Sequence, residues 1–303
     1  MSNLDKYNRR SSESAGPAER GVPAGVRVVA LFGGFLQTFG WLWFGFSMIS
    51  VWALTPLADV SSLWRFHGEL LQATGVVTLV SATNYSEGGD DDRPGTPVYA
   101  VDYEFRDASG IVRRGVGYTL GSKFNTGMPA PIEYRADNPA VSRIVGERTS
   151  PAPGWVLLLV GLFPAIGLVL LFFGLREGVR RSALLAHAKL APGRLIDKSP
   201  TNTRINNQPV IKYTFEFEVN GMKHTAIAKS HVGFRLEDEE FEQVLYDPKN
   251  PDRNYVVDAL PGGVTIRDGQ YVPPSPIKAF LTLLPPLLAV AVNVIGAWIV
   301  FGG

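Results

Sequence analysis

The chain has 303 residues, of which 19% are charged, and its formal net charge is only +1. So balanced a charge argues against a nucleic-acid-binding protein, which needs an excess of Lys and Arg. The chain contains no cysteine, and this excludes disulfides, thiolate zinc sites and a cysteine nucleophile.

The chain opens with a polar tail followed by a long apolar run. Residues 1–27 are rich in Ser, Arg and Glu and are expected to be disordered. Residues 28–54 carry no charge, and this run is much longer than the 7–15 or so residues of a signal-peptide core. Two further runs, 154–175 and 279–301, are also free of charge. Because a bilayer core needs roughly 20 helical residues, we predict three transmembrane helices.

A short helical pattern and a β-rich region follow each of the first two spans. Apolar residues recur on one side of residues 61–72 and of residues 177–189, which predicts two linker helices. The first linker helix and β-domain are assigned to residues 60–148, and the second to residues 177–272.

The two β-rich regions are copies of one another. A shift of 112 places residues 97–139 over residues 209–251 without a gap. It lays PVYAVDYEF (97–105) over PVIKYTFEF (209–217), and further along it aligns Tyr134 with Tyr246, Asn138 with Asn250, and Pro139 with Pro251. Upstream, residues 75–80 match residues 193–198 at a shift of 118. The difference between the shifts predicts that the first copy has a longer loop at residues 86–95.

Alternation predicts antiparallel strands in both copies. Aromatic and aliphatic side chains alternate with polar ones along residues 99–106 and 211–219, so one face of each sheet should be buried. Asn220 and Gly221 predict a type I′ hairpin turn, and residues 224–229 would form the returning strand. About five short strands per copy favour a small antiparallel barrel or sandwich, and the pattern does not distinguish them.

The chain resembles a widespread bacterial membrane-protein family of unknown function, in which a small β-domain ends on a Tyr-Asp-Pro-x-Asn-Pro turn. The matching segments in the second copy are INNQPVIKYTFEFEVNG (205–221), LYDPKNP (245–251) and VDALPG (257–262). The first copy has Arg135 and Ala136 in place of the Asp-Pro of the motif. The resemblance implies a membrane location and a mixed helix-and-strand fold, and it implies no activity.

A structural turn is the favoured interpretation of this motif, ahead of a partner-binding edge. The Asp247 carboxylate is expected to accept a backbone N–H two residues on. Pro248 and Pro251 restrict the chain on either side, and Tyr246 should anchor the end of the strand in the core.

No catalytic, cofactor-binding or metal site is predicted, and the chain is not expected to be an enzyme. The four histidines lack a zinc-site spacing and are interpreted as ordinary surface or core residues: His67, His187, His224 and His231. Residues 90–92 are three aspartates without a calcium-loop pattern, and residues 237–240 form an acidic cluster; both are interpreted as solvated loops.

The favoured function is that of a membrane-anchored interaction or scaffold protein that presents its β-domains to membrane or envelope proteins. The alternative is an accessory subunit of a membrane transport or envelope complex that uses polar residues within the spans: Gln37, Thr38, Thr282 and Asn293. The expected partners are the lipid bilayer and unidentified proteins. A second copy of the chain is also a candidate, because three helices could form a transport path only by self-association.

Basic residues predict the orientation in the cell membrane. They gather before the first span (Lys6, Arg9, Arg10, Arg20 and Arg27) and after the second (Arg176, Arg180, Arg181 and Lys189). This places the N-terminus and the second β-domain in the cytoplasm, with the first β-domain outside. A re-entrant second span, hinged near Pro164, would instead put both β-domains on one side.

Overall fold

The computed structural model describes residues 21–302, except residues 91, 206, 231–240, 262, 268 and 269. The chain divides into two compact units. One contains the second β-domain, with residues up to Phe44 and Ile166–Ala289; the other contains the first β-domain, with Gly45–Ala165 and the residues from Val290 onward. Most of the predicted disordered tail lies outside the described residues, but its last four residues, 24–27, already belong to a helix.

Among the described residues, two helices are long and apolar enough to cross a membrane. These are α5, which spans Trp155–His187, and α6, which spans Pro276–Phe301. The first predicted span is instead a bent pair, α2 (Ala24–Phe32) and α3 (Phe35–Leu54), whose axes meet at 69°. The two members pass the same test of length and composition only when they are taken together. A helix long and apolar enough to cross a membrane is therefore confirmed at two of the three predicted spans.

The break between α2 and α3 lies at two glycines and is held by a distant arginine. Gly34 has a φ of 104°, a conformation that a side chain would strain. Arg181 of α5 is buried, and its Nη1 donates to the carbonyl oxygen of Gly33 at 3.2 Å and of Ala30 at 3.5 Å. These bonds satisfy carbonyl groups that a helix end leaves without partners.

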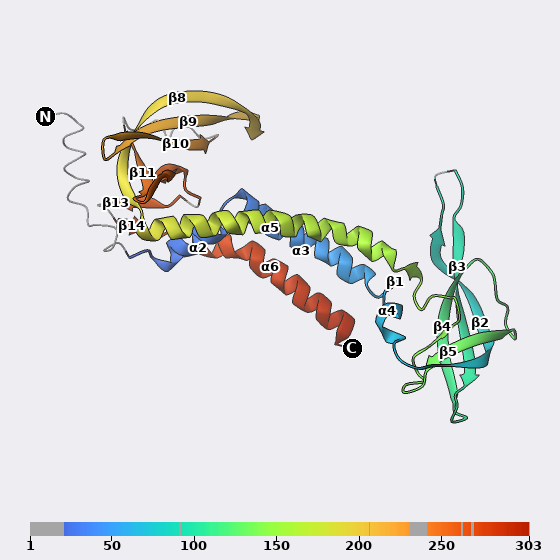
Figure 1. Ribbon diagram of the computed structural model, residues 1–303. Coiled ribbons are helices and arrows are strands. Elements are labelled where there is room, and N and C mark those ends of the chain that lie inside the picture. Colours follow the sequence, from blue (N-terminus) through green and yellow to red (C-terminus); the bar gives the residue numbers. More distant parts are fainter. Residues whose placement is uncertain are drawn as a thin grey trace. The chain divides into compact units, whose positions relative to one another are not determined.

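The two predicted linker helices are wrong as separate elements. In the first, only α4 (Ser62–Arg65) is helical, and Leu70 already begins strand β2 because it pairs with Arg135 of strand β5. In the second, residues 177–187 are the last three turns of α5, which runs unbroken through Pro164 (Figure 1). Pro164 therefore lies inside this helix and does not end it.

Each β-domain is one five-stranded antiparallel sheet, and the two sheets have the same strand order. The first is β4-β3-β2-β5-β6 and the second is β10-β9-β8-β11-β12. The strands of the first are β2 (Leu70–Glu87), β3 (Thr96–Arg106), β4 (Val112–Leu120), β5 (Pro129–Arg135) and β6 (Ser142–Ile144). Those of the second are β8 (Lys189–Ile205), β9 (Gln208–Val219), β10 (Met222–Ser230), β11 (Phe241–Asp247) and β12 (Asn250–Val256).

Neither predicted architecture, a closed barrel or a two-sheet sandwich, is found among the described strands. In each copy the long first strand pairs with two neighbours, so that the strands belong to a single sheet. The smaller elements are the parallel pair β1 (Ala58–Asp59) and β7 (Ala152–Pro153), the 3-10 turn η3 (Val257–Ala259), and the hairpin β13 (Thr265–Arg267) with β14 (Gln270–Val272).

The registers of the two sheets confirm the repeat. Val77 pairs with Tyr103 in the first copy, and Leu195 pairs with Phe215 in the second; one residue of the long strand then bulges at the equivalent place in both. The β2–β3 loop covers residues 88–95, whereas only residues 206–207 separate β8 from β9. The predicted six-residue difference is therefore located in this loop.

The next hairpin corrects the gapless alignment. In the first copy Arg106 pairs with Val112, whereas the equivalent Glu218 pairs with Lys223, so this turn is one residue shorter in the second copy. The φ angles of Asn220 and Gly221 are 53° and 79°, which confirms the predicted type I′ turn. The first copy has a longer turn, which is closed by the Asp107 carboxylate accepting the backbone N–H groups of residues 109 and 111.

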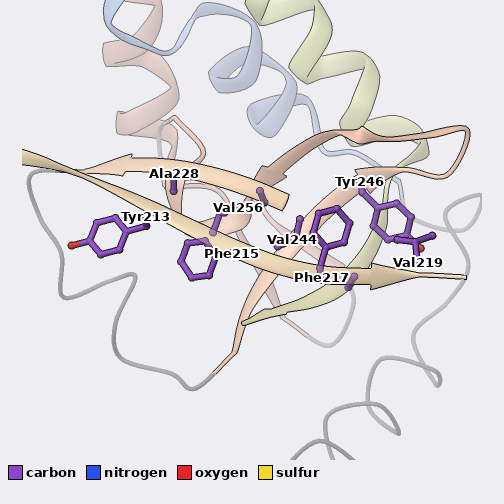
Figure 2. Close-up of a cluster of buried hydrophobic side chains, with 10 residues drawn as sticks. Tyr213, Phe215, Phe217, Val219, Ala228, Val244, Tyr246 and Val256 are labelled. Atoms are coloured by element: carbon purple, nitrogen blue, oxygen red, sulfur yellow. The ribbon is translucent and has the colours of Figure 1, made fainter. Parts of the chain in front are cut away.

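The predicted aromatic faces form the cores of the two sheets. In the second copy Tyr213, Phe215 and Phe217 are each at most 2% exposed, and they form one buried cluster with Val244 of β11 and Val256 of β12 (Figure 2). In the first copy Tyr103 and Phe105 occupy the equivalent positions, and the Tyr103 hydroxyl lies 3.0 Å from the Ser142 hydroxyl. The core of the first copy consists of its own β-domain residues only.

A second buried cluster fixes the second β-domain on the helices. Val26 and Val29 of α2 and Leu185 of α5 pack there against Leu245 of β11. The Tyr271 hydroxyl also donates to the Leu185 carbonyl oxygen at 2.8 Å. This domain therefore shares a continuous core with α2 and with the end of α5.

Candidate functional site

The residues singled out for possible chemistry do not come together. His67 and His187 are exposed, and the Nδ1 of His224 lies 3.0 Å from Asp252. Asp90 and Asp92 are exposed in the β2–β3 loop. His231, Asp91 and the acidic cluster at 237–240 lie outside the described residues. Within the part of the chain that the structure describes, no group of three His, Asp or Glu side chains could hold a metal ion.

The polar residues of the helices have mostly structural contacts. Asn293 accepts a hydrogen bond from the Trp52 indole at 3.2 Å, and the Thr282 hydroxyl donates to a backbone carbonyl of its own helix at 2.9 Å. Gln37 is 2% exposed in α3, and its side-chain oxygen has no hydrogen-bond donor among the described residues. The contacts of Asn293 and Thr282 fit helix packing.

A groove of about 1180 Å³ lies beside the second β-domain. One wall is the end of α5, and the other is the β11–β12 turn together with the start of β12. The helix contributes Glu177, Val179, Arg180, Ala183, Leu184, Ala186 and His187. The turn and strand contribute Asp247, Pro248, Lys249, Asp252, Arg253, Asn254 and Tyr255.

The turn that lines this groove is the Tyr-Asp-Pro-x-Asn-Pro motif. Asp247 accepts the backbone N–H of Lys249 at 2.9 Å, which confirms the predicted Asx-turn. Tyr246 is 9% exposed, and its ring centroid lies 5.8 Å from that of Phe217, which confirms its role as an anchor. The motif is therefore a structural turn, and its outer side also forms a groove wall.

The carboxylates of the groove already have partners. Glu177 lies 3.5 Å from the Arg181 guanidinium and accepts a hydrogen bond from the Tyr255 hydroxyl. Burial and this hydrogen bond raise the pKa of Tyr255 to about 12. Asp252 faces His224, and Asp247 is occupied by the backbone of its own turn.

Unlike its carboxylates, which have partners, the cations of the groove have no charged partner among the described residues. Arg180, Lys249 and Arg253 are exposed, and none of their side chains forms an ion pair with any residue that the structure describes. Val179 beside them is 53% exposed. The groove therefore combines an exposed apolar helix surface with three exposed cations that have no ion-pair partner among the described residues.

The equivalent turn of the first copy lacks this arrangement. Arg135 forms an ion pair with Asp137 within the turn and lowers the pKa of that carboxyl. Its guanidinium also donates at 3.4 Å to the carbonyl oxygen of Arg65, the last residue of the one-turn helix α4. The cation of this turn is thus neutralised, and the segment beside it has no extended helical wall.

The first β-domain instead has a shallow hollow of about 400 Å³ on the outer face of β2, β3 and β4. Leu79 and Val116 line it and are 54% and 40% exposed. Asp102 lies between them in the sheet, because it pairs with both. Exposed apolar residues that adjoin charged ones are common at protein-binding surfaces.

No protein-family model, curated protein or solved structure matches this chain. Its class therefore follows from its own architecture. It is a mixed helix-and-strand protein with two helices long and apolar enough to cross a membrane, and with two antiparallel sheets of the same strand order.

Sequence reasoning missed the groove, although two of its elements were visible. The motif turn was recognised, but residues 177–189 were assigned to a separate linker helix. The signal in the sequence is a helical pattern that continues without a break from residue 155 through the basic residues at 176–181. It predicts a helix longer than the apolar run, and the extra turns form the groove wall.

Proposed function

We propose that the protein is a membrane-anchored scaffold that acts by binding other molecules and not by catalysis. The observation that supports this best is that the two β-domains differ in what their residues pack against. The second shares a buried core with the helices, whereas the first has a core of its own and exposes Leu79 and Val116 around a hollow. The second domain would anchor the chain, and the first would recruit a protein partner.

We further propose that the chain crosses the cell membrane three times. The 20 residues of α3 give a helix about 30 Å long, which matches the hydrocarbon core. The bend then leaves α2 outside the core, where Val26 and Val29 pack on the second β-domain. The N-terminus and this domain would share one side, and the basic residues around both indicate the cytoplasm.

Cysteine labelling tests this orientation, because the chain has no cysteine of its own. Asn84 and Asn202 are exposed and occupy equivalent positions in the two copies, at the shift of 118. An impermeant maleimide added to intact cells should label Asn84→Cys, whereas Asn202→Cys should react only after lysis. Reaction of both cysteines in intact cells would contradict the proposed orientation.

Photo-crosslinking tests the scaffold role. A benzophenone amino acid at Leu79 or Val116 should capture a protein partner in living cells. The matched control is Asp197, which corresponds to Leu79 in the second copy and is also exposed. If the position in the first copy yields no protein adduct, or the same adducts as Asp197, the first β-domain is not the recruiting surface. The alternative, a subunit of a transport complex, would instead give adducts from Thr38, an exposed polar residue of α3.

A further inference from the structure

We propose that the groove between α5 and the β11–β12 turn binds the headgroup of an anionic phospholipid. The inference rests on the proposed crossing of the membrane by α5. The last apolar residue of that crossing is Leu175, and Arg180 follows one and a half turns later, about 7.5 Å further along the axis. A headgroup layer is roughly 5–8 Å thick on each side of the hydrocarbon core. Arg180 therefore lies at the depth of the lipid phosphates.

The charges of the groove favour an anion. Its three carboxylates are engaged by Arg181 and Tyr255, by His224, and by the backbone of the turn. Arg180, Lys249 and Arg253 have no ionic partner among the described residues, so their charge is available to a ligand. Each basic residue close to an anionic lipid surface strengthens binding by about fivefold, and three together by about a hundredfold.

The apolar surface favours a lipid over a free anion or an acidic protein segment. Phe172, Leu175 and Val179 are 64%, 46% and 53% exposed, and their spacing places them on one face of α5. This stripe runs from the membrane-crossing part of the helix directly into the groove, where Val179 is a lining residue. A phospholipid can follow the stripe with its glycerol and acyl groups while its phosphate meets the cations.

The test measures lipid retention by the full-length protein in detergent. Dioctanoyl phosphatidylglycerol is titrated and bound lipid is counted by native mass spectrometry. Separate titrations use dioctanoyl phosphatidylcholine, inorganic phosphate and a polyglutamate peptide. The groove variant combines Arg180→Gln, Lys249→Gln and Arg253→Gln. The control variant removes three exposed cations elsewhere on the same domain, with Arg194→Gln, Arg204→Gln and Lys229→Gln.

The wild type and the control variant should retain phosphatidylglycerol with affinities within about twofold of each other. The groove variant should bind it about a hundredfold more weakly. Equal loss in both triple variants, or equal retention of phosphatidylcholine, would overturn the proposal. Binding of phosphate alone with the same affinity would indicate a free-anion site, and binding of only the peptide would indicate a protein groove; either result also overturns it.

Two controls keep the outcome decisive. If the groove variant does not fold, as judged by circular dichroism and gel filtration, the single change Lys249→Gln is used. It lies on an exposed turn and should weaken binding about fivefold; unchanged binding would reject the site.

An alkaline wash of membranes tests the proposed function separately. Release of the chain by the wash would contradict the membrane anchor, whereas a chain that stays in the membrane without binding lipid contradicts only this inference.

Discussion

The two β-domains differ most on one row of side chains that crosses three strands. Register pairing makes the rows equivalent: Gln72, Glu133 and Arg143 in the first copy, and Leu190, Leu245 and Tyr255 in the second. In the first copy the row is polar, and Glu133 forms an ion pair with Arg143. In the second copy Leu245 is fully buried against the helices, with Leu190 and Tyr255 packed around it. This row of one sheet is therefore polar and partly exposed, and the same row of its copy is a docking surface.

This difference shows how a duplicated domain acquires a new role without a change of fold. Strand order, the bulge and the aromatic core are all kept, and three positions on the opposite face determine whether the sheet binds the helices. A side chain on that face points away from the core of the sheet, so it can change without disturbing that core. The following substitutions test this interpretation, from the largest expected effect to the smallest.

Leu245→Glu introduces into the second copy the residue that the first copy has at this position. It places an unpaired carboxylate among apolar residues, which should weaken docking by about 5 kcal/mol. Ala188→Cys, a nearly buried position in the same cluster, reports on docking, because a cysteine there should react slowly in the docked domain. Its modification should become much faster with Leu245→Glu.

The reciprocal change is the control. Glu133→Leu removes one partner of an ion pair whose side chains are 15% and 26% exposed, and its cost should be about 1–3 kcal/mol, below that of Leu245→Glu. An unaltered rate of modification at Ala188→Cys in the Leu245→Glu variant would show that this row does not hold the domain on the helices.

Phe215→Ala tests the part of the comparison in which the copies agree, namely the aromatic core. Phe215 is 1% exposed, so its truncation should lower the stability of the second sheet by about 3–5 kcal/mol. Hydrogen exchange of peptides from β8 to β11 measures this stability in the full-length chain. Lys212→Ala, on the other face of β9, should change it by less than about 0.5 kcal/mol. Similar exchange in the two variants would refute the assignment of faces.

Gly115→Ala tests a compensation within the cores. Gly115 pairs with Tyr103, and a methyl group at Gly115 would overlap the tyrosine ring, whereas the second copy pairs Phe215 with Ala226. The substitution should cost about 1–3 kcal/mol. Adding Tyr103→Phe removes the hydroxyl bonded to Ser142 and allows the ring to shift. The double variant should therefore lose clearly less than the sum of the single losses. Additivity within about 0.5 kcal/mol would argue against this compensation.

Tyr255 gives the smallest effect and a pH dependence specific to the second copy. Its phenol must be protonated to donate to Glu177, and its pKa is raised to about 12 from an ordinary 10. Its stabilising contribution is therefore complete below pH 10 and is lost as the pH rises from 10 to 12. Tyr255→Phe should cost about 1 kcal/mol at neutral pH and abolish this dependence. The difference in phenolate absorbance between the wild type and Tyr255→Phe follows the titration of Tyr255. A midpoint of this difference near pH 10 would contradict the prediction.

The repeated sheets could be predicted from the sequence, because their determinants are local. Period-two alternation identifies the buried face, Asn220 and Gly221 specify the hairpin, and the two shifts locate the longer loop. The extent of strand β2 could not be predicted in this way. Leu70 and Leu71 continue the helical spacing of apolar residues from the preceding segment. Residues 70–72 nevertheless pair with β5 and form the start of strand β2. A tertiary contact here outweighs the local pattern.

The candidate groove and the broken helix pair depend on contacts between distant residues. The Asx-turn at Asp247 follows from its own sequence, but the wall facing it exists only because α5 continues beyond Leu175. The uncharged run at 28–54 contains a pair of glycines at its break, yet glycine pairs also occur in straight membrane helices. The break requires donors for the carbonyl groups that it exposes, and Arg181 supplies them.

The bond between Arg181 and Gly33 also has a consequence for the order of events during synthesis. The two residues are 148 positions apart, and a ribosome adding roughly 5–20 residues per second needs about 7–30 s to pass from one to the other. During that interval the carbonyl oxygens of Ala30 and Gly33 have no donor from α5. The helix pair α2–α3 is therefore made before the residue that fixes its bend, and it reaches its final shape only after this part of α5 has been synthesised.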